Sequence, residues 1–113
     1  MIDIEETSKR KYKNDIYRRT ERILYSYRDM VYITTQANAE HLEETKEIIR
    51  IIEACLECIK DEPYADIIKY KYIEKLSDER ISEIKYCNPS TITRHRKKLI
   101  KRISDMLFPK HLF

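Results

Sequence analysis

The chain has 113 residues, of which 38% are charged and 42% hydrophobic, and it contains no glycine. This length allows one compact domain or two very small ones, and it is too short for a barrel enzyme or a full doubly wound sheet. Phosphate-binding loops, dinucleotide-binding motifs and nucleophile elbows all need glycine, so these motifs are excluded. Two-residue β-hairpins also favour glycine. The composition therefore predicts an all-α protein.

The net charge of +3 conceals a strong segregation of charge along the chain. Residues 9–28 contain eight basic and two acidic side chains, and residues 88–113 contain seven basic and one acidic. Residues 29–62 reverse this balance, with three basic and nine acidic side chains. Such asymmetry favours a polyanionic partner for the two basic segments. The alternative, a solvated helix surface, stays open on charge alone.

Residues 1–62 are predicted to form an antiparallel helical hairpin. From about 12 to 33, apolar residues recur at the 3.6-residue period of an amphipathic helix, and a turn is expected near 34–38. The second helix ends near Lys60 and carries a heptad-like seam, which Ile48, Ile51 and Cys55 widen. A seam this broad predicts packing against two neighbours, or against one neighbour and a second protomer. A homodimer through residues 42–59 is the hypothesis we favour. The seam positions are Leu42, Thr45, Ile49, Ile52, Leu56 and Ile59.

Residues 63–113 are predicted to form a second unit of three helices, beginning at Pro63. The first helix is expected over about 64–74, with Ile67, Ile68 and Tyr72 buried. Ser77 is a good N-cap for a short second helix that ends near Tyr86. Asn88 and Pro89 then favour the start of a last helix over about 90–107.

The last helix has two chemically distinct faces. At about 100° per residue, Leu99, Ile103, Met106 and Leu107 lie within about 60° of Ile92, and His95 lies on the same side. The opposite side carries Ser90, Arg94, Lys97, Lys98 and Lys101; we call these five residues the basic face. Two short helices joined by a tight turn, the second of them basic, are typical of a helix-turn-helix.

The segment 72–99 resembles the DNA-binding region four of bacterial sigma factors. Ser77 matches the serine that caps the second helix of that family, and Ile81-Ser82 match the isoleucine and small residue that follow it. Thr91-Ile92 match the Ser/Thr-Val pair that opens the recognition helix. The resemblance covers roughly residues 64–107 and implies a three-helix, sigma-region-four-like DNA-binding domain.

Tyr86 stands where the sigma family has its turn glycine. A bulky residue is strained in a left-handed conformation, so we expect a longer or differently shaped loop there. The N-terminal 60 residues have no room for a sigma region two. In a chain this short, with a helical N-terminal half, the resemblance is closest to the ArpU-type and RinA-type late-gene transcriptional regulators of phages that infect Gram-positive bacteria.

The sequence therefore predicts a DNA-binding site on the last helix. Ser90, Thr91 and Arg94 lie at the end that enters the major groove in such motifs, so they are candidates for base-edge contacts. Phosphate candidates are Lys97, Lys98 and Lys101, and also Thr93 and Arg96, which flank the apolar stripe and are able to snorkel to the backbone. The basic residues 9–22 are either a second phosphate contact or a solvated helix start.

The sequence predicts neither a catalytic site nor a metal or cofactor. Cys55 and Cys58 form a Cys-x-x-Cys pair, but zinc needs four donors, and the histidines show no supporting spacing. Cysteine usage and an acidic N-terminus indicate a reducing, cytoplasmic compartment of a bacterial cell, with the protein on the nucleoid. No membrane association is expected.

The function predicted from the sequence is sequence-specific binding of double-stranded DNA by a transcriptional regulator. The resemblance implies a phage or prophage activator of late genes, with bacterial RNA polymerase as a second partner. Two other functions remain compatible with the sequence. One is a DNA-packaging subunit like the small terminase; the other is a protein-interaction module that binds RNA polymerase.

Overall fold

A computed structural model describes residues 4–36 and 42–109 of the chain. All secondary-structure elements within these residues are helices, and none is a strand, which confirms the predicted all-α class. The elements are α1 (Ile4–Thr34), α2 (Glu43–Ile59), the single π-helical turn η2 (Lys69–Ile73), α3 (Asp78–Lys85) and α4 (Pro89–Leu107). None of the helices in the described part is both long enough and apolar enough to cross a membrane.

One hydrophobic core joins all of these elements. Leu24 comes from α1 and Ile52 from α2, Tyr72 belongs to η2, Ile81 to α3 and Ile100 to α4, and each is at most 2% exposed. Side chains of this size contribute about 1.5–3 kcal/mol each when fully buried. The core therefore ties the N-terminal helices to the C-terminal ones. Its other members are Cys55, Ile59, Ile67, Ile68, Ile92, Leu99 and Ile103.

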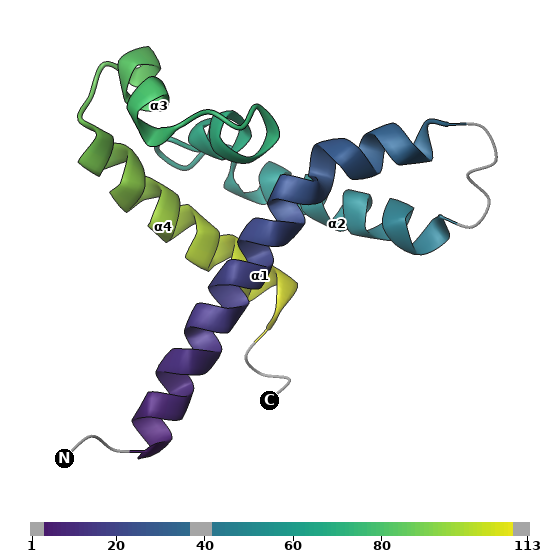
Figure 1. Ribbon diagram of the computed structural model, residues 1–113, viewed down its shortest axis with the longest axis horizontal. Coiled ribbons are helices and arrows are strands. Elements are labelled where there is room, and N and C mark those ends of the chain that lie inside the picture. The colour runs from purple at the N-terminus through teal and green to yellow at the C-terminus, as the bar shows by residue number, and fades with distance from the viewer. Residues whose placement is uncertain (1–3, 37–41, 110–113) are drawn as a thin grey trace.

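The two halves of α1 have different surroundings. Its C-terminal half lies along α2, and its middle crosses α4, while the N-terminal half extends away from the other helices (Figure 1). Residues 5–15 are all exposed, and within residues 5–36 Thr20 is the first buried position. We call residues 4–16 the arm.

Helix boundaries differ from the prediction in two places. The first helix begins at Ile4 rather than near Tyr12, because the charged residues of the arm continue the helix without an apolar face; ion pairs one turn apart, Lys9–Glu5 and Arg10–Glu6, accompany this extension. The helix expected over 64–74 is shorter. Tyr64 has a φ of 62°, which is incompatible with a right-handed helix at that residue. The π-helical turn begins only at Lys69. Residues 37 and 38 of the expected turn lie outside the described residues.

The link between α3 and α4 consists of residues 86–88, so of the two expectations, a longer loop or a differently shaped one, the longer loop is not formed. Tyr86 takes up the left-handed conformation itself, with φ 55° and ψ 47°, and its side chain is 96% exposed. Its N–H and that of Cys87 cap the end of α3, since Cys87 N donates to Ser82 O at 3.0 Å. At the start of α3, Ser77 Oγ accepts from Arg80 N at 3.1 Å, as predicted for an N-cap.

Replacing Tyr86 by glycine is expected to stabilise the fold. The exposed ring loses no packing, and glycine relieves a left-handed conformation that costs other residues roughly 1–2 kcal/mol. Glycine also gains conformational freedom in the unfolded chain, so the net increase in the free energy of unfolding should be about 0.5–1 kcal/mol. Urea denaturation of Tyr86→Gly measures this change, and a loss of stability would show that the tyrosine makes a contact essential to the turn.

Candidate nucleic-acid interface

The apolar side of α4 fixes its position on the body of the protein. Ile92, Ile100 and Ile103 are fully buried, as is Leu99 at 5% exposure. On the side towards α1, the hydroxyls of Ser104 and Thr20 lie 2.7 Å apart and share a buried hydrogen bond. This polar contact lies where α1 crosses α4, so it sets which face of α4 meets α1.

A half-buried ion cluster fixes the rotation of α4 about its axis. The guanidinium of Arg96 lies 3.1 Å from Asp78 Oδ2 at the start of α3 and 3.5 Å from Glu21 Oε2 of α1. Tyr72 OH donates to the same Glu21 oxygen at 2.7 Å, and Lys71 Nζ lies 3.1 Å from Asp78 Oδ1. We call these five residues the Arg96 cluster. It connects three helices and the π-helical turn through charge-assisted contacts.

The electrostatics of this cluster favour its charged forms. Burial alone would raise the pKa of Asp78, but hydrogen bonds from Arg96, Lys71 and Thr93 outweigh it and hold that pKa below its usual range. Burial likewise works against the charge on Arg96, but its hydrogen bonds with Tyr72 and Asp78 prevail and raise its pKa. Tyr72 is the uncharged member of the cluster. Burial and its hydrogen bond to Glu21 raise the pKa of its hydroxyl. The cluster is therefore an internal ion pair at neutral pH.

The opposite side of α4 is the basic face, and it is open to solvent. Ser90, Arg94, Lys97, Lys98 and Lys101 are all exposed. Within residues 4–36 and 42–109, no carboxylate lies within ion-pair distance of its four cations. Cations elsewhere on the surface do have partners one turn away, for example Arg50 with Glu47 at 3.3 Å and Arg80 with Glu83 at 2.9 Å. The basic face is thus a row of charges with no paired carboxylate in the part of the chain that the structure describes.

Arg96 and Thr93, two of the residues predicted to contact DNA, do not lie on the basic face. Arg96 has a side chain only 13% exposed and engaged in the Arg96 cluster. Thr93 Oγ1 lies 3.0 Å from Asp78 Oδ2 and 3.1 Å from the Pro89 carbonyl oxygen, so its hydroxyl is occupied as well. Thr91 is half-buried, whereas Ser90 and Arg94 project freely. The structure thus gathers Ser90, Arg94, Lys97, Lys98 and Lys101 on one surface and turns Thr93 and Arg96 inward.

Three contacts hold the edges of this surface. His95 stacks on Tyr64 with ring centroids 4.1 Å apart, which accounts for its place beside the apolar stripe. Lys85 Nζ lies 2.8 Å from Asp66 Oδ2, and Arg102 pairs with Glu62. Each contact joins α3 or α4 to the segment 62–66. The segment 62–66, which follows α2, is therefore packed against α3 and α4.

Sequence reasoning missed the carboxylates that hold Arg96. Asp78 and Glu21 lie 18 and 75 residues from Arg96 in the chain, so no local pattern connects them with it. A signal was present: at 100° per residue, Arg96 lies only about 40° from Ile92, so a buried partner was required for its charge.

Comparison with known proteins gives no relative for this chain: no family model matches it, and no curated protein or solved structure is similar to it.

Substitution of Arg96 should lower the free energy of unfolding much more than substitution of Arg94, two residues earlier on α4. Arg96→Ala leaves the carboxylates of Asp78 and Glu21 half-buried without their cation, which should cost about 2–4 kcal/mol. Arg94→Ala removes an exposed, unpaired charge and should change the free energy of unfolding by less than about 0.5 kcal/mol. Chemical denaturation of both variants measures the difference. Equal effects would mean that the Arg96 cluster does not hold α4.

Proposed function

We propose that the protein is a sequence-specific, double-stranded DNA-binding transcriptional regulator that inserts α4 into the major groove. In this proposal α3 and α4 are the two helices of a helix-turn-helix, and residues 63–113 form the DNA-binding unit. The N-terminal helices form a hairpin that carries other contacts. The observation that carries the proposal is the basic face, because its four cations are exposed, have no ion-pair partner among the described residues and are arranged along one side of one helix.

The position of the side chains along α4 suggests separate roles. Arg94 and Ser90 lie in the first two turns, the part of a recognition helix that reaches base edges, and arginine pairs bidentately with guanine. Lys97, Lys98 and Lys101 lie further along and are suited to phosphates. Thr91, at the edge of this surface, is retained as a base-edge candidate. Thr93 and Arg96 are instead assigned to positioning α4.

The biological setting of the proposal rests on the resemblance of residues 64–107 to sigma region four. That resemblance supports a phage or prophage activator of late genes, of the ArpU or RinA type. Bacterial RNA polymerase is then the second proposed partner, contacted through surfaces other than α4. The exposed acidic residues of α2, Glu43, Glu44, Glu47 and Glu53, offer a surface complementary to a basic patch.

Binding experiments should separate base reading from phosphate contact. Selection of bound oligonucleotides should yield a defined motif, and Arg94→Ala should relax that motif at a cost of roughly 1–3 kcal/mol in binding free energy. Lys98→Ala should weaken all sequences about equally and reduce the salt dependence by about one unit, since it removes one phosphate contact.

Two outcomes would contradict the proposal. The first is failure of the wild-type protein to bind any duplex at moderate salt. The second is binding that Arg94→Ala and Lys98→Ala both leave unchanged. Binding to RNA polymerase without DNA binding would favour the protein-interaction alternative.

A second copy of the chain is the partner we propose for α2. The structure buries Ile52, Cys55 and Ile59 of its seam inside the protein, but Ile48 is 39% and Ile51 41% exposed. The two exposed isoleucines lie three residues apart and therefore on one face of the helix. A twofold dimer through this face would bring two copies of α4 to one DNA molecule and lengthen the site that is read.

Substitution of Ile51 by lysine should abolish the dimer without unfolding the monomer, because the side chain is only partly buried. Analytical ultracentrifugation should show a dimer for the wild type and a monomer for Ile51→Lys, with equal helix content by circular dichroism. A wild-type protein that sediments as a clean monomer at the concentrations used for DNA binding would refute the dimer.

A further inference from the structure

The arm of α1 continues the side of the helix that packs against α4. Residues three and four apart lie on the same face of a helix, so the buried Thr20 is followed towards the N-terminus by Ile16 and Tyr17, then by Lys13, and then by Lys9 and Arg10. The apolar part of this stripe packs on α4, and the basic part extends beyond it. Three cations of the arm therefore lie on the side of α1 that faces α4. Lys9 and Arg10 are also in exposed ion pairs with Glu5 and Glu6, and no ion pair joins Lys13 to a described carboxylate.

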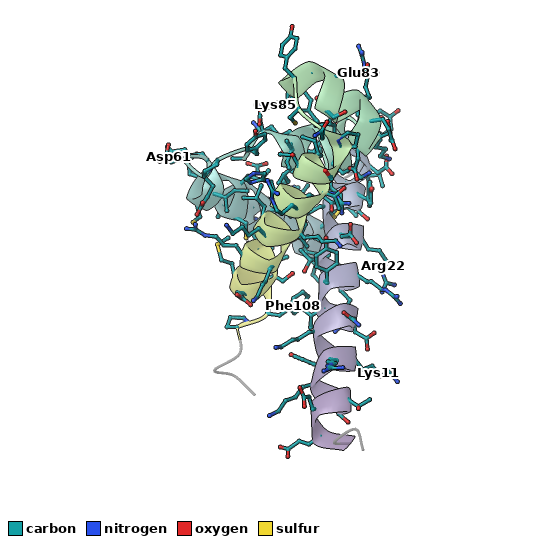
Figure 2. The ribbon with its side chains drawn as sticks, turned by 90° about the vertical axis from the view of Figure 1, so that its left-hand side faces the viewer. Lys11, Arg22, Asp61, Glu83, Lys85 and Phe108 are labelled. Carbon is teal, nitrogen blue, oxygen red and sulfur yellow. The ribbon has the colours of Figure 1, made fainter. Side chains whose placement is uncertain are left out.

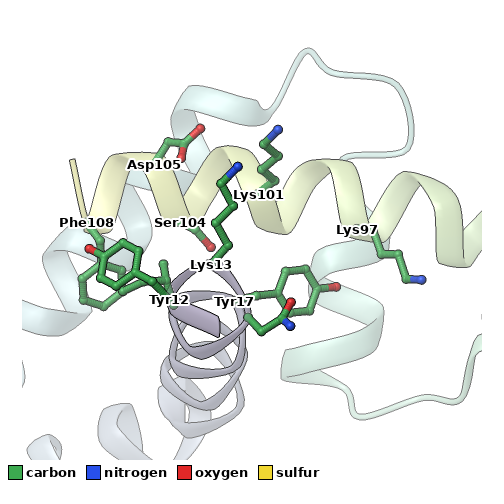
Figure 3. Close-up of a pocket in the computed structure, with 10 residues that line it drawn as sticks. Tyr12, Lys13, Tyr17, Lys97, Lys101, Ser104, Asp105 and Phe108 are labelled. Atoms are coloured by element: carbon green, nitrogen blue, oxygen red, sulfur yellow. The ribbon is translucent and has the colours of Figure 1, made fainter. Parts of the chain in front are cut away.

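Lys13 lies beside the basic face of α4. Lys13 of α1 and Lys97 and Lys101 of α4 line one open groove of about 470 Å³ at the crossing of the two helices. Figure 3 shows the side chains of Lys13 and Lys101 extending in the same direction from the two helices. Asp105 lies on the same rim, and no carboxylate within residues 4–36 and 42–109 is paired with Lys13.

The walls of the groove strengthen its positive field. Tyr12, Tyr17 and Phe108 contribute aromatic surface to the same groove, with Tyr12 and Phe108 on one side of Lys13 and Tyr17 on the other (Figure 3). Clefts with charges of one sign and walls of low dielectric constant focus the electrostatic potential. Lys13 and Lys101, one from each helix, extend side by side at this groove and are placed to receive a phosphate group together, while Lys97 lies further along α4 (Figure 3).

We infer that the arm is a second DNA-contacting element, in which Lys13, with Lys9 beyond it, binds the phosphate backbone of the same duplex that α4 reads. This inference rests on the proposed function and extends it. The duplex lies between α4 and the arm, with its backbone passing the groove at the crossing. The arm adds affinity and a longer footprint and no base discrimination, since lysines at phosphates carry no sequence information.

The matched control for Lys13 is Lys11. Lys11 lies on the other side of the arm, turned away from α4 (Figure 2). Lys13→Ala and Lys11→Ala each remove one exposed lysine from the same helix and replace it by the best helix former. The two variants therefore have the same net charge and similar helix stability, and they differ only in the face of α1 that loses its cation.

The experiment measures the dissociation constant of each full-length variant for the selected duplex between 50 and 200 mM salt by fluorescence anisotropy. Lys13→Ala should reduce the magnitude of the slope of log K against log salt by about 0.9, the value for one phosphate contact. The ratio of the wild-type affinity to the variant's affinity should therefore fall about threefold between 50 and 200 mM salt. Lys9→Ala/Lys13→Ala should reduce the magnitude of the slope by about 1.8. Lys11→Ala should leave the slope unchanged.

The possible results separate this inference from the proposed function. Equal slopes for Lys13→Ala and Lys11→Ala, in a protein whose binding still depends on Arg94, overturn the inference and leave the proposed function standing. Loss of the selected motif in Lys13→Ala also overturns it, because a phosphate contact does not read bases. Failure of the wild-type protein to bind duplex DNA overturns both.

Discussion

The orientation of α4 depends on the half-buried guanidinium of Arg96. It meets Asp78 at the start of α3 and Glu21 on α1, so one side chain connects the three helices that define the proposed DNA-binding surface. Removing charges from water is costly, and attraction between them offsets that cost only when the geometry is good and the remaining polar atoms are bonded. Here Tyr72, Lys71 and Thr93 supply further bonds, whereas the buried Nε of Arg96 has no hydrogen-bond partner among the described residues. Such a cluster contributes more to specificity of packing than to net stability, because only one rotation of α4 brings all of these partners together.

The same cluster explains why two arginines of α4 have different environments. Arg96 satisfies the carboxylates inside the protein, and Arg94, two residues earlier and about 160° away around the helix, is left in solvent. With the interior charges compensated by Arg96 and Lys71, the lysines of the basic face have no partner among the described residues. Their positive field is directed outwards, and Lys13 of the arm lines the same groove as Lys97 and Lys101. One cation of the N-terminal basic segment thus lies beside the C-terminal basic segment.

The periodicity of the sequence predicts the all-α class and much of the core, because the hydrophobic period of a helix is a local signal. Ile67, Ile68, Tyr72 and Ile92 are buried as expected. Ser77 caps α3 for the same reason, since a cap depends on residues within one turn. The arm was missed because a helix without an apolar face has no such period. The roles of Arg96 and Thr93 were missed because the carboxylates that bind them lie 15 to 75 residues away in the sequence, and only the tertiary structure brings them together. Tyr86 shows that an exposed tyrosine, held by the backbone hydrogen bonds that cap α3, is able to take up a conformation usual for glycine.

The central claim is that α4 binds duplex DNA with Arg94 while Arg96 stays inside the protein. Side-chain NMR of the arginine Nε–H groups tests it most directly, because it reports both guanidinium groups in one titration with duplex DNA. The account predicts that the Arg94 signal shifts in proportion to bound DNA and that the Arg96 signal keeps its position and its slow exchange with water. A shift of Arg96 with an unchanged Arg94, or no shift of either signal at saturating DNA, would contradict it.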